Sequence, residues 1–487
     1  MRTMGAAETM KDEEKSPEFL RRLGLMDTAF LVVGAVVGSG IFLTPGIIAA
    51  GLPSPGLLLA VWLAGGLVTL CGALSFAELG AMYPRAGGQY VYLREAYGAG
   101  AAFVFGWGFF GFIMCGGLAA LAVGFAEFFG AFVPGLSMGT PILHIAAAGL
   151  SYTLSAGQVV AAASIMLLTL LNTFGIRAGI AVQNLLTVFR IGAVVGLIVL
   201  GVAFGTKTGG TNFQHLFPGG LSFPGLWRAL GLALVAVFWT YDGWYSVNCT
   251  AEEVRNPERN IPRGLALGVG GVAILYVSVN VVYLLALPLE KIQGVTRVGV
   301  LVTTSLFGPG ASTAILAVIM VSVFGCLNAN LLFGPRVYYA MAKDGSFFRS
   351  MARLSPRFRV PTRALWGQAA WSAVLCLLGA YQALYEYMVF ALLVFFAATG
   401  LAVFVLRRKR PDVVRPYRTW GYPAVPAIFI VVCLAIFVSI LAAQPLKSAI
   451  GLVLLGAGMP AYFIWRKRPS RETGPADKGV GTGTDLV

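Results

Sequence analysis

Long apolar runs separated by short polar segments make up most of the chain. A helix that crosses a bilayer needs about 20 predominantly apolar residues. We interpret twelve runs as membrane spans, at residues 27–50, 57–83, 101–133, 159–173, 181–204, 230–250, 265–287, 313–337, 365–378, 387–406, 425–442 and 449–465. Because the number of spans is even, both ends of the chain are expected on the same side of the membrane.

The first span is interrupted near its middle. It contains the sequence Gly38-Ser39-Gly40, and Pro45 follows shortly after. Glycine weakens a helix because it loses much backbone freedom on ordering, and proline has no N–H to donate, so a break is predicted here. Unpaired backbone groups cost several kcal/mol in hydrocarbon, so a break persists only where protein buries it or a cavity adjoins it. The pattern therefore predicts a binding site at mid-membrane.

The sixth span repeats this interruption. Residues 238–244 place an ionisable side chain, Asp242, beside Gly243 inside an apolar run. Five spans begin at each interrupted span, and the two interrupted spans run in opposite directions because five is odd. Paired units of opposite topology with broken helices are typical of inverted-repeat secondary transporters. The predicted fold is therefore an all-α integral membrane protein with twelve transmembrane helices. They form a 5+5 inverted repeat with discontinuous helices 1 and 6, plus two extra C-terminal helices.

This topology divides the chain into five parts. They are an N-terminal tail at 1–25, repeats at 26–205 and 228–408, helices 11 and 12 at 409–466, and a C-terminal tail at 467–487. Lysine and arginine gather in alternate loops. The positive-inside rule then predicts a multi-pass protein of the cell membrane with both termini in the cytoplasm.

The composition supports the membrane class. Hydrophobic residues make up 58% of the chain and charged residues 11%, whereas charged residues average about 25% in soluble domains. The formal net charge of +15 lies in short loops. These loops lack the interleaved aromatic residues of a nucleic-acid-binding face, so we expect the lipid bilayer, and no nucleic acid, as a partner.

The sequence contains no cluster of histidine, cysteine or acidic residues with the spacing of a catalytic or metal-binding site. His144 and His215 lie in separate loops, and the six cysteines lie in or beside apolar runs without a C-x-x-C pair. We therefore predict no catalytic residue, no metal and no cofactor, and a protein that is not an enzyme. The pattern Gly106-x-Gly108-x-x-Gly111 fits a dinucleotide motif, but no strand precedes it, so that interpretation fails.

The predicted breaks suit a zwitterion. If the first helix stops near Val36 and restarts at Ser39, the restarted half presents free N–H groups and a positive dipole end, which suit a carboxylate. Free carbonyl groups, which suit an ammonium group, are expected at Ala35, Val36, Val37, Trp239, Thr240 and Tyr241. Such a pocket fits an α-amino acid. The alternative is that the small residues only allow close helix packing.

Several segments together resemble the amino acid–polyamine–organocation superfamily, nearest its L-type amino acid transporter branch. The similar segments are residues 37–42, 78–79, 83–94, 242–244, 251–254, 256–257, 327–328, 335–339, 344–345, 415–418 and 421–423. The resemblance implies that the substrate carboxylate meets the N–H groups of Ser39, Gly40 and Ile41. It also implies that the ammonium group meets carbonyls of Val36, Trp239 and Asp242. The expected substrate site comprises Val36, Gly38, Ser39, Gly40, Ile41, Trp239, Thr240, Tyr241, Asp242 and Gly243.

Two further roles follow from the resemblance. Trp239 matches an aromatic gate over the substrate, although a packing tryptophan would also explain it. In the resembling family, members that form a disulfide to a single-span partner glycoprotein use a cysteine in the external loop at 134–158. This chain has none there, so no disulfide-linked partner is expected. The sequence leaves the oligomeric state open.

Among the charged residues, Arg190 says most about the expected ion dependence of the protein. It lies inside the fifth apolar run, where an arginine costs about 2.5–3.5 kcal/mol to insert, so it either faces a polar interior or snorkels to the surface. In the resembling family a lysine often occupies this place, where sodium-coupled relatives of the fold bind a cation. Arg190 would then be a permanent cation surrogate, because arginine does not deprotonate in proteins. We therefore expect sodium independence.

The acidic residues near the membrane admit several roles. Asp242 could receive a cationic substrate group, carry a proton, or cap the second half of its helix. Four other acidic residues at cytoplasmic ends are expected to form gate salt bridges with Arg85, Arg255 or Arg336, and they are Asp27, Glu78, Glu252 and Glu253.

The predicted function is that of a secondary transporter, or permease, that moves amino acids by alternating access. Sodium-independent exchange or facilitated transport of neutral amino acids is favoured, because no carboxylate cluster indicates a basic substrate. The alternative is a proton-coupled symporter of amino acids or amines. A channel would need a ring of polar residues along a pore. A membrane enzyme would need a nucleophile with a base, or a metal set.

Overall fold

The computed structural model describes residues 19–52, 54–147, 150–205, 211–217, 223–378 and 381–466. The helices of the first half are α1 (Leu25–Val36), α2 (Gly40–Gly51), α3 (Pro55–Met82), α4 (Gln89–Tyr97), α5 (Ala99–Gly108), α6 (Met114–Phe132), α7 (Ala156–Thr173), α8 (Ile176–Gly205) and α9 (Thr211–Gln214). This half also contains a π-helical turn η1 (Phe109–Ile113), a 3₁₀ turn η2 (Pro134–Leu136), and the strands β1 (Pro141–Ala147) and β2 (Leu150–Ser155).

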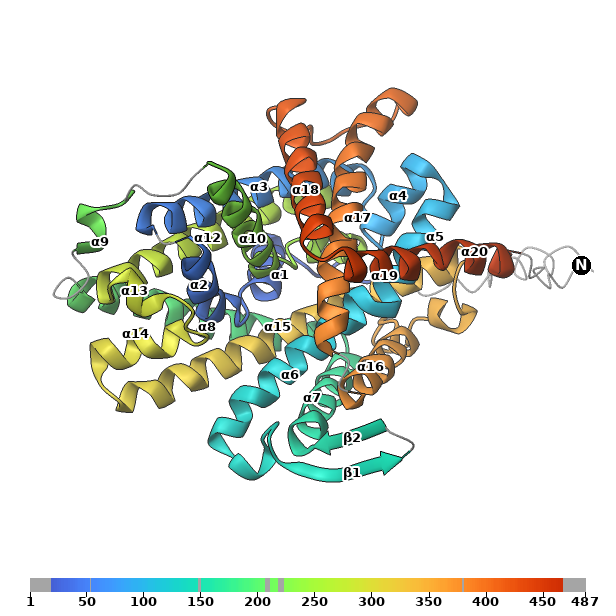
Figure 1. Ribbon diagram of the computed structural model, residues 1–487. Coiled ribbons are helices and arrows are strands. Elements are labelled where there is room, and N and C mark those ends of the chain that lie inside the picture. Colours follow the sequence, from blue (N-terminus) through green and yellow to red (C-terminus); the bar gives the residue numbers. More distant parts are fainter. Residues whose placement is uncertain are drawn as a thin grey trace, which may run out of the picture.

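The second half is helical throughout its described part. Its helices are α10 (Phe223–Thr240), α11 (Ser246–Cys249), α12 (Pro257–Ala286), α13 (Leu289–Ile292), α14 (Val298–Phe307), α15 (Gly310–Lys343), α16 (Thr362–Leu377), α17 (Tyr381–Lys409), α18 (Ala424–Ala443), α19 (Pro445–Gly456) and α20 (Gly458–Arg466). Two 3₁₀ turns, η3 (Ala251–Glu253) and η4 (Arg349–Ala352), connect them. Figure 1 shows α1, α2, α10 and α12 near one another, with α18 beside α10.

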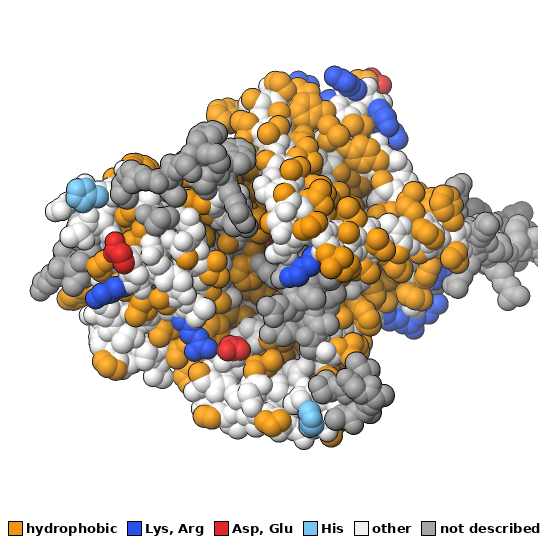
Figure 2. All heavy atoms as spheres, in the orientation of Figure 1, with side chains coloured by type: hydrophobic (Ala, Val, Ile, Leu, Met, Phe, Trp, Pro, Cys, Tyr) orange, Lys and Arg blue, Asp and Glu red, His pale blue; other side chains and the backbone are white. Residues whose placement is uncertain are grey.

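The helix lengths are those of a multi-pass membrane protein. Among the described residues, nine helices are long and apolar enough to cross a bilayer, and the pair α1–α2, bent by 47°, makes a tenth. The predicted sixth span falls on α10, α11 and the turns between them, and the ninth on α16, which has 16 residues. Figure 2 shows hydrophobic side chains spread over much of this face and few charged ones, as expected of a surface in contact with lipid. The twelve-span count and the inverted repeat stay predictions.

The first break lies where the glycines predicted it. Helix α1 ends at Val36, Ser39 is the N-cap residue of α2, and α2 begins at Gly40. Pro45 lies inside α2 and does not end it. The proline leaves the Ile41 carbonyl without its usual helical donor, and the Tyr283 hydroxyl donates to this carbonyl at 3.4 Å.

The third predicted span contains a turn that the sequence analysis did not foresee. Helices α5 and α6 are joined by the π-helical turn η1. A π-turn disturbs the regular backbone ladder and is frequent at functional sites. Here the Gly111 carbonyl accepts a hydrogen bond from Trp371 Nε1 of α16 at 2.8 Å. The turn therefore ties the third span to α16.

A β-hairpin corrects the all-α prediction. Strands β1 and β2 pair antiparallel within the segment that was expected to be a polar external loop. Ser155 ends the hairpin and caps α7, because its Oγ accepts from the Gln158 N–H at 3.3 Å. The Gln158 amide also donates to the Cys376 and Leu377 carbonyls, each at 3.1 Å, which ties α7 to α16. The Tyr152 hydroxyl of β2 donates to the Leu377 carbonyl and fastens the hairpin to α16.

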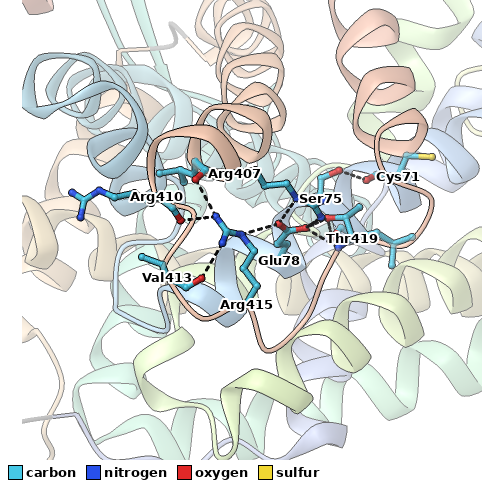
Figure 3. Close-up of polar contacts among 10 residues, drawn as sticks. Cys71, Ser75, Glu78, Arg407, Arg410, Val413, Arg415 and Thr419 are labelled. Carbon is cyan, nitrogen blue, oxygen red and sulfur yellow. Dashed lines mark hydrogen bonds and ion pairs between the residues drawn. The ribbon is translucent and has the colours of Figure 1, made fainter.

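The C-terminal helices are fastened to the first half through Glu78 of α3. Figure 3 shows Arg407, Arg415 and Thr419 converging on this carboxylate. Arg407 donates to it at 2.9 and 2.7 Å, and the Thr419 N–H and hydroxyl each donate at 2.7 Å. The Arg415 guanidinium donates to the carbonyls that end α17 and lies 3.8 Å from Glu78. The predicted pairing of Glu78 with Arg85, Arg255 or Arg336 is therefore wrong.

We predict that α2 is fixed by contact with residues 292–295. A Cβ added at Gly46 would lie 2.0 Å from the Val295 carbonyl oxygen, whereas one added at Gly51 meets nothing within 4 Å. Gly46→Ala is therefore expected to destabilise the protein by about 1–3 kcal/mol, as overpacking does. Gly51→Ala is the matched control in the same helix and is expected to leave stability nearly unchanged. The measurement is the melting temperature of the detergent-solubilised protein, and equal values for both variants would contradict the prediction.

Candidate functional site

The carbonyl groups at the end of α1 all have partners from the protein. Arg190 Nη1 donates to the Gly34 carbonyl at 2.8 Å and to the Val37 carbonyl at 2.5 Å. The Cys326 thiol donates to the Ala35 carbonyl at 3.0 Å. The Val36 carbonyl accepts from the Tyr276 hydroxyl at 3.0 Å and from the Gly38 N–H at 2.9 Å. The sequence analysis expected these carbonyls to be free, but they already have donors, since a helix end in a membrane needs internal partners. Their binding of a substrate ammonium group stays a prediction.

Tyr276 connects the two broken helices. Its hydroxyl lies 3.0 Å from the Val36 carbonyl at the end of α1 and 3.2 Å from the Thr240 carbonyl at the end of α10. Tyr276 belongs to α12 and is fully buried, with its ring against Trp62 and Tyr241. One hydroxyl therefore satisfies both helix ends and keeps them together. The sequence analysis missed this residue, because a tyrosine in an apolar run carries no distinguishing pattern.

Arg190 lies in the interior beside the first break. Its side chain is fully buried on α8 and points at the end of α1, so it does not snorkel to the surface. Gly325 of α15 makes room for it, because a Cβ there would lie 2.1 Å from Arg190 Nη2. No carboxylate among the described residues forms an ion pair with Arg190. The positive charge is therefore balanced by carbonyl dipoles at a helix C-terminus.

The opposite side of the break presents free donors. The Phe42 N–H donates to the Ser39 carbonyl at 3.0 Å. The N–H groups of Ser39, Gly40 and Ile41 have no hydrogen-bond partner within the described part of the chain. Three unpaired donors at the positive end of a helix are suited to an anion such as a carboxylate.

Two of these donors, the N–H groups of Ser39 and Gly40, belong to residues that line a cavity of about 520 Å³. Seven of the ten predicted substrate-site residues line it, namely Val36, Gly38, Ser39, Gly40, Trp239, Thr240 and Asp242. Three do not. Ile41 is fully buried, the Tyr241 hydroxyl donates to the Trp62 carbonyl at 3.2 Å, and Gly243 packs against Ala35. Gly243 has φ 96°, and a Cβ there would lie 2.8 Å from the Ala35 carbonyl oxygen, so only glycine fits.

The cavity walls differ in polarity. Asp242 lines the cavity and is partly exposed as a residue, and its Oδ1 atom is buried without a hydrogen-bond partner within the described residues. The facing wall belongs to η1 and α6 and consists of small or apolar residues, among them Ile113, Met114, Gly117 and Leu121. The sequence analysis did not identify these positions. Their small and apolar character does not distinguish them from lipid-facing residues.

Two ion pairs, one at the mouth of the cavity and one beside the start of α1, differ in burial. At one end, Arg297 and Glu127 line the mouth and form an ion pair of 3.4 Å, with side chains 44% and 52% exposed. Beside the start of α1, in a region that we call the closed end and that does not line the cavity, Glu253 forms an ion pair with Arg336 at 2.7 Å. Those side chains are 1% and 2% exposed. The Glu253 carbonyl also accepts the N–H groups of Arg22 and Leu23, so the chain before α1 is held there.

The closed-end contacts were predicted in part. The pair of Glu253 with Arg336 is one of the expected gate salt bridges, and it is confirmed. Burial raises the pKa of the Glu253 carboxyl above its usual value, and the Arg336 guanidinium opposes that effect. The expected salt bridges of Glu252 and Asp27 are wrong. Glu252 accepts the Ala86 N–H at 3.1 Å, and Asp27 accepts from Gly24 and Asn184.

Comparison with known proteins places these features in a family. The sequence profile of the family described as amino acid permease matches residues 23–460. The b(0,+)-type amino acid transporter 1 of Mus musculus is 29% identical, over 95% of this chain and 93% of its own length. The serine/threonine exchanger SteT of Bacillus subtilis is 30% identical, over 92% of this chain and 97% of its own. The cystine/glutamate transporter of Homo sapiens is 28% identical, over 94% and 88%.

We predict that the Tyr276 hydroxyl contributes strongly to stability. Tyr276→Phe would leave two buried helix-end carbonyls without this donor, and a buried unsatisfied group costs about 1–3 kcal/mol. The matched control is Tyr83→Phe, because the buried Tyr83 hydroxyl has no hydrogen-bond partner within the described residues. We expect a lower melting temperature in detergent for Tyr276→Phe only. A loss of the same size in both variants would show that the hydroxyl bridge is not the cause.

Proposed function

Because this chain belongs to the amino acid permease family, we propose that it exchanges neutral amino acids across the cell membrane without sodium. One observation carries the proposal: Ser39 and Gly40, whose N–H groups are free, and Asp242, whose side chain is a carboxylate, line the same cavity. A cavity that pairs anion donors with an acceptor suits the zwitterion of an α-amino acid.

The proposed substrate pose follows from these groups. The α-carboxylate accepts from the N–H groups at the start of α2. Since the carbonyls at the end of α1 already have donors, the α-ammonium group lies toward Asp242. The substrate side chain then extends toward η1 and α6, where Ile113, Met114 and Leu121 favour neutral side chains. Trp239 lines the same cavity and is the proposed gate over the bound substrate.

Alternating access is supported by the contrast between the exposed mouth of the cavity and the closed end. The positive-inside pattern and the two broken helices support the inverted repeat, with both termini in the cytoplasm. The conformation described is then open to the outside at Arg297 and closed inside by Glu253 and Arg336. Transport requires the inner pair to separate while the outer mouth narrows.

Arg190 supports sodium independence. Its guanidinium occupies the space beside the first break and donates to the Gly34 and Val37 carbonyls, which a bound cation would otherwise contact. A permanent charge on the protein removes the need for a bound ion. The similarity to an exchanger named for serine and threonine supports exchange and small neutral substrates.

Asp242 favours a second candidate, a transporter of amino acids with cationic side chains or a proton-coupled symporter. A carboxylate with an unpartnered oxygen beside the cavity could receive a cationic group or a proton.

As for partners, the hairpin segment at 134–158 contains no cysteine, and we propose that the transporter has no disulfide-linked partner.

Uptake into proteoliposomes tests the main proposal. We expect uptake of labelled serine, threonine or larger neutral amino acids to require internal amino acid and to be unchanged when choline replaces sodium. Gly40→Val is expected to abolish uptake, since even a Cβ at Gly40 would lie 2.7 Å from Thr240 Cγ2. Gly270→Val is the control, because that position has nothing within 4 Å. Uptake abolished by sodium removal would refute sodium independence, and full activity of Gly40→Val would refute the site.

Asp242→Asn separates the roles of the carboxylate. If Asp242 receives the ammonium group, the loss of a charged hydrogen bond worth about 1.5–3 kcal/mol raises KM roughly tenfold or more. The pH profile of transport then stays that of the parent. Asp412→Asn, in an exposed loop, is the control and should change neither quantity. A variant whose transport no longer responds to a pH gradient that drives the parent would instead establish the proton-coupled alternative.

A further inference from the structure

A second, smaller hollow of about 230 Å³ lies at the closed end, apart from the substrate cavity. Three segments that are distant in the sequence form it: the chain before α1, the start of α8, and the residues after η3. Each segment contributes one arginine to the lining, namely Arg22, Arg177 and Arg255.

The three arginines are not neutralised by the protein. None of them forms an ion pair within the described part of the chain, although Arg255 Nε donates to the Arg21 carbonyl at 3.4 Å. The one carboxylate that lines the hollow is Asp27. Its two oxygens already accept from the Gly24 N–H at 2.9 Å and from the Asn184 amide at 2.8 Å. The hollow therefore keeps an excess of positive charge.

An apolar stripe on α8 leads away from this hollow. Ala181 lines the hollow and is exposed. Leu185 and Phe189 follow at helical spacing and are 70% and 50% exposed, respectively. Residues four apart lie on one face of a helix, so the three side chains form one continuous surface in the bilayer. Basic side chains at the foot of an apolar, lipid-facing helix form the arrangement that attracts anionic lipids.

We propose that this hollow binds the phosphate group of an anionic membrane lipid, with the acyl chains along Ala181, Leu185 and Phe189. Arg22, Arg177 and Arg255 contact the phosphate. The apolar stripe favours a lipid over a free phosphate ion, because the ion gains nothing from it. The site is independent of the substrate site and rests only on the membrane location of α8.

The bound lipid would stabilise the closed end. Arg22 and Arg255 flank the backbone contacts that join the chain before α1 to η3. There the Arg22 N–H donates to the Glu253 carbonyl, and the Arg255 N–H donates to the Leu23 carbonyl, each at 2.8 Å. A phosphate held by both arginines spans this contact. Because a ligand stabilises the state that it binds best, anionic lipid favours the conformation with a closed end.

Native mass spectrometry of the full-length transporter tests the binding. The probes are phosphatidylglycerol and phosphatidylcholine with the same acyl chains. We expect phosphatidylglycerol to bind the parent more tightly and Arg177→Gln to weaken it roughly fivefold. That factor corresponds to about 1 kcal/mol for each basic side chain near a membrane surface. Arg259→Gln, an exposed arginine of α12 outside the hollow, is the control and should bind as the parent does. Equal phosphatidylglycerol affinity in parent and Arg177→Gln overturns the proposal.

Two further arms separate the sources of phosphate and exclude a folding defect. Inorganic phosphate and glycerol phosphate at millimolar concentration should not displace the lipid, and displacement by either would overturn the lipid assignment. Hydrogen–deuterium exchange at residues 22–27 should slow when phosphatidylglycerol is added to the parent in detergent. It should not slow in Arg177→Gln, whose unchanged melting temperature without lipid would show that it is folded. Equal slowing in both would refute the stabilisation of the closed end.

Discussion

The helix break between Val36 and Gly40 is the constraint on which the rest of the structure depends. A helix that ends at mid-membrane exposes carbonyl groups that hydrocarbon cannot satisfy, so the protein must supply donors. They come from three other helices: Arg190 from α8, Tyr276 from α12, and Ser322 and Cys326 from α15. The packing of these helices around α1 follows from that requirement.

The backbone groups on the two sides of the break differ in whether the described part of the protein supplies hydrogen-bond partners for them, and the side without partners is the candidate binding site. The carbonyl side is closed by the protein's own donors, including the fixed charge of Arg190. The N–H side faces a cavity and keeps its donors free. A ligand that approaches therefore finds anion donors on α2 and the carboxylate of Asp242, not a ring of carbonyls. The proposed pose therefore moves the ammonium group toward Asp242 and leaves the carboxylate at the start of α2, where the sequence analysis expects it.

The ion pair at the closed end and the ion pair at the cavity mouth differ in burial, which bears on the conformational change of transport. Glu253 and Arg336 are almost completely buried at the closed end, whereas Glu127 and Arg297 are about half exposed at the mouth. Separating a buried pair is costly unless water or other partners replace the contact. Opening the closed end therefore requires hydration of both side chains, and the hollow with Arg22, Arg177 and Arg255 places further charge beside that contact.

The sequence by itself determined the membrane class, the place of the first break and the family, and seven of the ten residues that it assigned to the substrate site line the cavity. Local chemistry carries that information, because apolar run length, glycine and proline act within a few residues of themselves. Only the tertiary structure decided which donors satisfy α1, that Ile41, Tyr241 and Gly243 do not line the cavity, and that Glu78 pairs with Arg407. These outcomes depend on helices distant in the sequence. The β-hairpin and the π-helical turn were also not foreseen, since each makes contacts with α16 that the sequence pattern does not show.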